Sequence, residues 1–169
     1  MLYTIYLLSV WLHILAAITW VGGMFTLLLV VVPWLRRGDR AQAAAMLRDT
    51  GPRLRDIGRI CFGLLAITGT FNLWARGVRL SSFGSAAWLA SPFGRAVLWK
   101  LGVFGVILGV SAAHDFILGP RATVAVLANP QSAQAQRMRR GASYLGRLNA
   151  LLALLIVALA VTLVRGLPF

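Results

Sequence analysis

The chain has 169 residues, of which 59% are hydrophobic, and its mean hydropathy is +0.80. A water-soluble domain of this size carries far more polar surface, so the composition excludes a soluble enzyme. The formal net charge of +13 would suit a nucleic-acid binder if the basic residues formed one stripe on a polar domain, but here they lie between long apolar runs. The charge therefore indicates membrane topology, and no nucleic-acid partner is expected.

Four apolar segments predict four transmembrane helices. They cover approximately residues 3–32, 57–74, 92–118 and 144–164. Each is close to the length of about 20 residues that a helix needs to cross a bilayer. The predicted fold class is therefore all-α, an integral membrane four-helix bundle that forms a single transmembrane domain over residues 1–169, with no long-period repeat evident in the sequence.

The first apolar segment has no Lys or Arg ahead of it and continues to Val32, which is too long for a cleaved signal peptide. We interpret it as the first span, closed by Pro33. In the connection that follows, Asp39 is expected to cap a short Ala-rich helix that Gly51 and Pro52 end.

The later segments carry clearer start and stop signals. Gly77 follows the second segment, and Ser91 with Pro92 has the residue types of an N-cap and a first helical position for the third. Gly119 and Pro120 are expected to stop the third helix, because proline cannot continue the backbone hydrogen-bond ladder.

The distribution of Lys and Arg predicts the orientation. Twelve of them lie in segments 36–59 and 121–147, and five lie on the opposite side of the membrane. Because basic residues are retained in the cytoplasm, both the N-terminus and the C-terminus are predicted to be non-cytoplasmic, in a bacterial cytoplasmic (inner) membrane. The second basic segment contains Asn129 and Pro130, near which the fourth helix is expected to begin and run unbroken into the membrane.

The sequence excludes several kinds of catalysis. It has no phosphate-binding loop, GxSxG, HExxH or CxxC motif, and it contains no Glu. Three of the four Asp residues lie in the first cytoplasmic connection and the fourth, Asp115, ends the third span, so paired-carboxylate chemistry is excluded. Cys61 is the single cysteine, which excludes an intramolecular disulfide and a cysteine metal cage.

Ionisable side chains inside a bilayer are costly and indicate functional sites. His13 and Lys100 each lie seven residues, about 10 Å, inside the expected outer ends of their spans. Asn72 approaches the same level from the second span. We therefore expect a cofactor or metal site in the outer half, made by His13, Lys100 and Asn72. His114 is the weaker metal candidate, because it lies about 21 Å along the third helix from Lys100.

Helical spacing predicts which way these side chains point. His13 shares a small and polar face with Ser9 and Ala16, so it is expected to point towards neighbouring helices. Lys100 and His114 share a face of the third helix. A second face of that helix is suited to close helix contact, and it consists of Gly102, Gly105, Gly109 and Ala112.

Each candidate also has a purely structural explanation. His13 could be a neutral imidazole hydrogen-bonded to a neighbouring helix, and Lys100 could extend its ammonium group to the lipid headgroups. His114 could belong to an inner-interface network, whose other members would be Asp115, Tyr144, Arg147 and Asn149.

Three stretches resemble a known family: WLHILAAITWVGGMFTLLLVVVPWLRR in the first span, TGTFN in the second and WKLGVFGVILGVSAAHDFILGPR in the third. They resemble the copper resistance D (CopD) domain family and, more distantly, the HemJ-type protoporphyrinogen oxidases. The HemJ resemblance implies a b-type haem associated with a histidine of the first helix and a lysine of the third, and His13 and Lys100 stand at those positions. The chain departs from that type at VVVPWLRR, where an aromatic stretch ending in a further histidine is usual, so protoporphyrinogen oxidation is not assigned.

Three functions remain open after the sequence. In the first, haem b binds in the outer half, with His13 as axial ligand and Lys100 as opposite ligand or propionate partner, and transfers electrons. A quinone or a larger membrane redox complex would then be the partner beside the lipid bilayer.

The second function is copper binding or transport, which the family name implies. Soft-metal sites need clustered ligands, whereas Met24, Met46 and Met138 are scattered. The third function is that of a non-catalytic accessory subunit in a larger membrane complex. A homo-oligomer is compatible with all three, and the sequence does not decide whether the protein is an enzyme.

Overall fold

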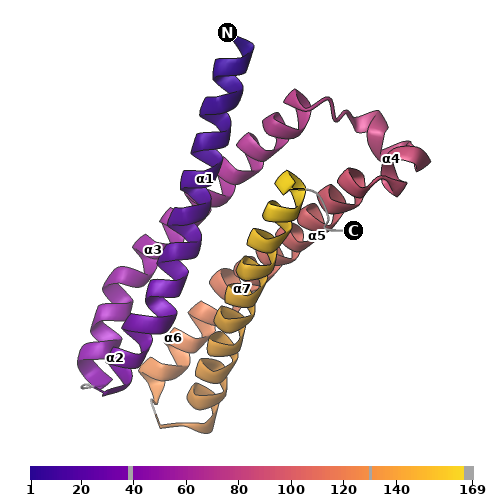
Figure 1. Cartoon of the computed structure of the whole chain (residues 1–169). Coiled ribbons are helices and arrows are strands. Elements are labelled where there is room, and N and C mark those ends of the chain that lie inside the picture. Colours follow the sequence, from indigo (N-terminus) through magenta and orange to yellow (C-terminus); the bar gives the residue numbers. More distant parts are fainter. Residues whose placement is uncertain (38–39, 130, 166–169) are drawn as a thin grey trace. The chain divides into compact units, whose positions relative to one another are not determined.

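The computed structural model describes residues 1–37, 40–129 and 131–165, and it is helical throughout its regular structure in these ranges (Figure 1). The chain divides into two compact units, Met1–Ser85 and Ala86–Phe169. Each unit is a helical hairpin and is considered by itself. Asp39, predicted to be a helix cap, lies outside the described residues.

In the first unit, α1 (Leu2–Thr26) passes through a π-helical turn, η1 (Leu27–Val31), into α2 (Val32–Arg37). The long helix α3 (Arg40–Ala75) then returns antiparallel beside α1. It is followed by the short 3-10 helix η2 (Leu80–Gly84).

Small and polar side chains form the contact between α1 and α3. Ser9 and Ala16 of α1 and Cys61 and Thr68 of α3 are all buried. Their size allows the two backbones to approach closely, as is usual between helices in a membrane. The predicted inward face of the first helix is therefore the face that contacts α3.

The prediction that Gly51 and Pro52 end a separate short helix is wrong. Both residues lie inside α3, which runs through them into the apolar segment. Pro52 removes one backbone donor, but the helix formers Leu47 and Arg48 before it and Arg53 and Leu54 after it favour continuation of the helix. α3 ends where Gly77 adopts a φ of +86°, a conformation that glycine reaches without steric cost.

In the second unit, α4 (Ala86–Ala90) leads into α5 (Pro92–Ala112), the π-helical turn η3 (Ala113–Leu118) and α6 (Gly119–Ala128). The helix α7 (Ala133–Arg165) packs against α5 and α6. Its 33 residues confirm the prediction of a fourth helix that begins outside the apolar segment and runs unbroken into it.

The predicted start of α5 is confirmed in detail. The side-chain oxygen of Ser91 accepts a hydrogen bond from the backbone N–H of Gly94 at 3.0 Å, and Pro92 is the first helical residue. Gly94 is required here, because an added Cβ would lie 2.1 Å from the carbonyl oxygen of Trp88. This capped turn fixes where α5 begins, eight residues before Lys100.

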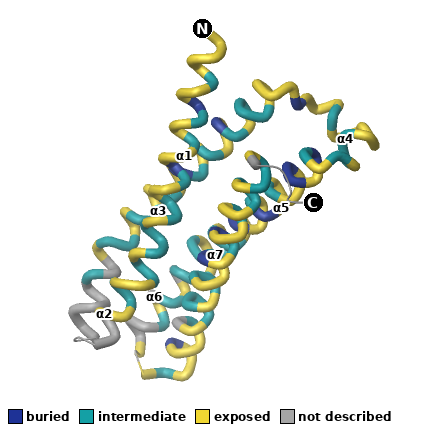
Figure 2. The backbone as a smooth tube through the Cα atoms, viewed as in Figure 1, coloured by how far each residue is buried: buried dark blue, intermediate teal, exposed yellow. Residues whose placement is uncertain are grey.

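Four of the described helices are long and apolar enough to cross a membrane, which confirms the four predicted spans. Their ranges are Leu2–Trp34, Asp49–Ala75, Pro92–Leu118 and Ala133–Val164. Most of their large apolar side chains are exposed within the units, for example Ile67 at 70% and Leu29 at 66% (Figure 2). Surface of this kind is stable in contact with lipid and not with water.

The two units repeat one layout that the sequence alone does not reveal. In each, a long helix passes through a π-helical turn, continues past a proline and connects to an antiparallel partner. Pro33 and Pro120 each follow a π turn by two residues and do not stop their helices as predicted. The wider π turn accommodates the missing backbone donor of a proline, so the helix bulges instead of ending.

The stripe of Gly102, Gly105, Gly109 and Ala112 does not form the contact between α5 and α7. All four residues are exposed within the second unit, and a Cβ added at any of the three glycines would meet nothing within 4 Å. The contact uses the opposite side of α5, where Val103 and Ile107 are buried. Helical periodicity identified two faces, but it did not identify which one faces α7.

Candidate functional site

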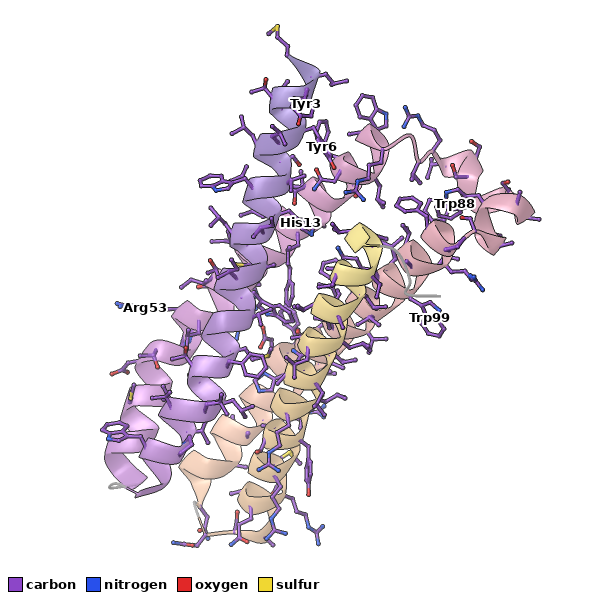
Figure 3. The ribbon with its side chains drawn as sticks, in the orientation of Figure 1. Tyr3, Tyr6, His13, Arg53, Trp88 and Trp99 are labelled. Carbon is purple, nitrogen blue, oxygen red and sulfur yellow. The ribbon has the colours of Figure 1, made fainter. Side chains whose placement is uncertain are left out.

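His13 lies on the side of α1 that faces α3, as its position beside Ser9 and Ala16 predicts (Figure 3). Its ring nitrogen Nδ1 is 2.8 Å from Oγ1 of Thr68. The imidazole is half-buried, within one of the four apolar helices. His13 is therefore oriented by a specific hydrogen-bond partner on the neighbouring helix.

The hydrogen bonds of Thr68 assign the tautomer of His13. The Thr68 hydroxyl has one proton, which it donates to the carbonyl oxygen of Leu64 at 2.5 Å. Towards His13 the same oxygen must then act as the acceptor, so the proton of the ring lies on Nδ1. Nε2 is left as the unprotonated nitrogen and carries the lone pair that a metal ion would take.

Two further contacts hold this arrangement. An added Cβ on Gly69 would lie 3.3 Å from Cε1 of His13, so the absence of a side chain lets the ring lie against the α3 backbone. The hydroxyl of Ser9 donates to the backbone carbonyl of Thr68 at 3.5 Å. Seven residues inward from His13, the ring of Trp20 packs 5.0 Å from that of Phe62, centroid to centroid. The interface between α1 and α3 is therefore polar around His13 and apolar further inward, around Trp20.

Polar side chains continue from His13 to the outer end of the hairpin. Asn72 follows Thr68 by one turn of α3, and its Oδ1 atom is buried without a hydrogen-bond partner among the described residues. One further turn outward, Nε of Arg76 donates to the hydroxyl oxygen of Tyr6 at 3.1 Å. We call His13, Thr68, Asn72, Tyr6 and Arg76 the polar ladder of the first unit.

A buried acceptor without a partner costs about 1–3 kcal/mol, so Asn72 marks a place where a donor is missing. In the sequence, Asn72 stands four residues after Thr68 and four residues before Arg76. This makes Asn72 a candidate binding residue on structural grounds that are separate from its depth in the sequence.

Lys100 belongs to the second unit, where it is half-buried on α5. It lies twenty residues before Pro120, and His13 lies twenty residues before Pro33. The two residues therefore occupy corresponding positions in the repeated layout. This correspondence is independent of the estimate that placed His13 and Lys100 at similar depths from the outer ends of their spans.

The described contacts of the residues predicted to form a network around His114 are made with different partners. Nδ1 of His114 lies 3.2 Å from Oδ1 of Asp115, and both residues are in the π turn η3. The side-chain nitrogen of Asn149 donates instead to the hydroxyl oxygen of Ser111 at 2.8 Å. The remaining two predicted members form a third pair, in which the guanidinium of Arg147 lies 6.0 Å from the ring centroid of Tyr144.

Sequence reasoning selected His13 and Asn72 as candidates but did not identify the residues that contact His13 or those at the outer end of the polar ladder. Thr68 and Gly69 hold the imidazole, and Tyr6 and Arg76 close the outer end of the ladder. A signal was present in TGTFN, because Thr68 and Asn72 are four residues apart and so share one face of an otherwise apolar helix. In the part of the chain that the structure describes, no three His, Cys, Asp or Glu side chains converge.

Four apolar spans define a polytopic membrane protein, and a hydrogen-bonded histidine lies between two of its helices. The chain belongs to the copper resistance protein D (CopD) family, whose model matches residues 48–163. This confirms the CopD resemblance, and the match takes in Asn72, Lys100 and His114 but not His13.

An uncharacterized protein of Aquifex aeolicus (strain VF5) is 31% identical to this chain over 160 residues, which are 94% of this chain and 95% of that protein. Since so little of the chain lies outside this alignment, it extends over the first span and His13. No solved structure matches the chain.

Proposed function

We propose that this CopD-family protein binds b-type haem in the outer half of the bundle, with His13 as an axial ligand, for electron transfer or redox chemistry. The observation that supports this most directly is the chain of hydrogen bonds from Nδ1 of His13 through Thr68 to the carbonyl of Leu64. A histidine that ligates a metal through one ring nitrogen typically donates the other N–H to a protein acceptor.

The residues of the first unit fit such a group. A haem needs only one or two protein ligands, because the porphyrin supplies the other four nitrogens, and Nε2 of His13 is the unprotonated donor that this role requires. Gly69 gives the ring its position, and the pair of Trp20 and Phe62 keeps the inner side apolar. When bound, a haem supplies one-electron chemistry, which none of the side chains of this site provides by itself.

Lys100 has the second role in the proposal, as the opposite axial ligand or as the partner of a propionate. Its correspondence with His13 in the repeated layout supports this assignment. The electrons would be exchanged with a membrane quinone or with a larger membrane redox complex, since a site inside the lipid bilayer is reached from the membrane.

The proposed haem predicts the spectrum of the purified protein. After haem-replete expression, the protein should show a Soret band and, once reduced, an α-band, with about one haem per chain in a pyridine haemochrome assay. A colourless protein would contradict the proposal. If that protein retained copper, the function implied by the family description would replace it, and a protein with neither cofactor would favour an accessory subunit.

We also propose that both termini face away from the cytoplasm of a bacterial cell, in its cytoplasmic membrane, because the twelve-to-five distribution of Lys and Arg favours this orientation. Alkaline phosphatase fused after Phe169 should therefore be active, and the same enzyme inserted at Ala133 should be inactive. Green fluorescent protein at the two positions should give the reverse pattern. An active phosphatase at Ala133 would overturn the orientation.

A further inference from the structure

The polar ladder ends at a positive charge that has no carboxylate partner among the described residues of its own unit. The first unit's described carboxylates, Asp49 and Asp56, lie 27 and 20 residues before Arg76, both on α3, which ends one residue before Arg76. At 1.5 Å per residue, the nearer one is about 30 Å away along the axis. An anion that pairs with Arg76 must therefore come from outside this unit's own side chains.

Hydrogen-bond donors suited to such an anion are present at this end. Arg76 uses Nε to donate to Tyr6, and its two terminal nitrogens have no protein partner among the described residues. The Tyr6 oxygen accepts that bond, so its own O–H is a further donor at the same place. A guanidinium fork beside a phenol matches a carboxylate, which accepts two parallel N–H bonds and a third bond from a hydroxyl.

The other arginine nearby is already used by the fold. The guanidinium of Arg79 donates to the carbonyl oxygens of Trp74 at 2.6 Å and Val78 at 3.1 Å, and it lies 5.1 Å from the ring centroid of Trp74. Arg79 therefore closes the end of α3, whereas Arg76 presents its terminal nitrogens at the surface. The two residues are three positions apart and carry the same charge, which makes them a matched pair for comparison.

We propose that Tyr6 and Arg76 bind the propionate carboxylates of the haem. This inference rests on the proposed function and adds the site that holds the acidic edge of the cofactor. Tyr6 precedes His13 by seven residues, about 10 Å along α1, and Arg76 follows Thr68 by eight residues, about 12 Å along α3. Both separations are comparable with the reach from a haem iron to its carboxylates, so an iron bound at His13 would bring the propionates to this pair.

The experiment compares two porphyrins that differ only at the carboxylates. Full-length protein from haem-deficient cells, in detergent, is titrated with iron protoporphyrin IX and with its dimethyl ester, and binding is followed at the Soret band. The wild type should prefer the free acid by roughly tenfold or more, the value of one charge-assisted hydrogen bond. Arg76→Gln should remove most of the preference and Tyr6→Phe should reduce it, because each variant keeps the donor of the other residue, while Arg79→Gln should keep the full preference.

The outcomes separate this inference from the haem proposal. If Arg76→Gln and Tyr6→Phe retain the wild-type preference, or if the wild type has none, the carboxylate site is wrong and haem binding at His13 still stands. If the wild type binds neither porphyrin with a Soret shift that depends on His13, both proposals fall. Arg76→Lys provides a check on folding, because it keeps the charge without the fork and should retain part of the preference.

Discussion

His13→Ala is expected to remove the Soret band and the reduced α-band from the purified protein. The substitution deletes Nε2, the donor that the hydrogen bond to Thr68 leaves unprotonated, and no other histidine is present in the first unit. We expect at least a tenfold loss of haem content relative to wild type, measured as pyridine haemochrome per chain. Full haem content in His13→Ala would contradict the assignment of this residue as a ligand.

Thr68→Val provides the matched comparison, because valine has nearly the shape of threonine and lacks the acceptor. The ligand would remain, but its Nδ1–H would lose the oxygen at 2.8 Å. We expect weaker haem binding, by about tenfold, and a higher midpoint potential, since a less polarised imidazole stabilises ferric iron less well. If Thr68→Val removed haem as completely as His13→Ala, the threonine would be required for folding of the hairpin and not only for orientation of the ring.

Lys100→Met and His114→Ala are expected to give opposite results. Methionine keeps the length of the lysine side chain while it removes the ammonium group, so the spectrum or the midpoint potential should change if Lys100 is a ligand or a propionate partner. His114 lies fourteen residues further along the same continuous helix, about 21 Å away, and its imidazole is paired with Asp115. His114→Ala should therefore leave both quantities nearly unchanged.

Parallel absorption spectra and redox titrations of these two variants test the position of the haem. Loss of the haem signal in His114→Ala, together with a normal Lys100→Met, would defeat the outer-half assignment. A bis-histidine haem deeper in the membrane would then replace it. Thermal unfolding of both variants, followed by circular dichroism, controls for a general loss of structure.

The sequence by itself determined the elements that depend on local composition. The number of spans followed from the length of the apolar runs, because a bilayer imposes that length on any helix that crosses it. The cap at Ser91 and the unbroken helix α7 followed from short-range signals in the same way. The prediction of which face of α1 points inward was also correct, because small and polar residues recur on that face with helical spacing.

Local signals failed at the prolines, since no short sequence pattern distinguishes a helix end from a π turn or an uninterrupted helix. Pro33 and Pro120 follow bulges, and Pro52 lies within α3. In each case the helix continues because the surrounding turns satisfy the backbone groups that the proline releases.

Only the tertiary structure decided which side chains meet. The hydrogen bond of His13 to Thr68 and that of Arg76 to Tyr6 both depend on the axial register between α1 and α3. Helical periodicity defines the faces of each helix separately, and it does not define how far one helix slides along the other. A different axial register would bring other side chains opposite Thr68 and Tyr6 and break both contacts, so the partners of His13 follow from the packing of α1 on α3.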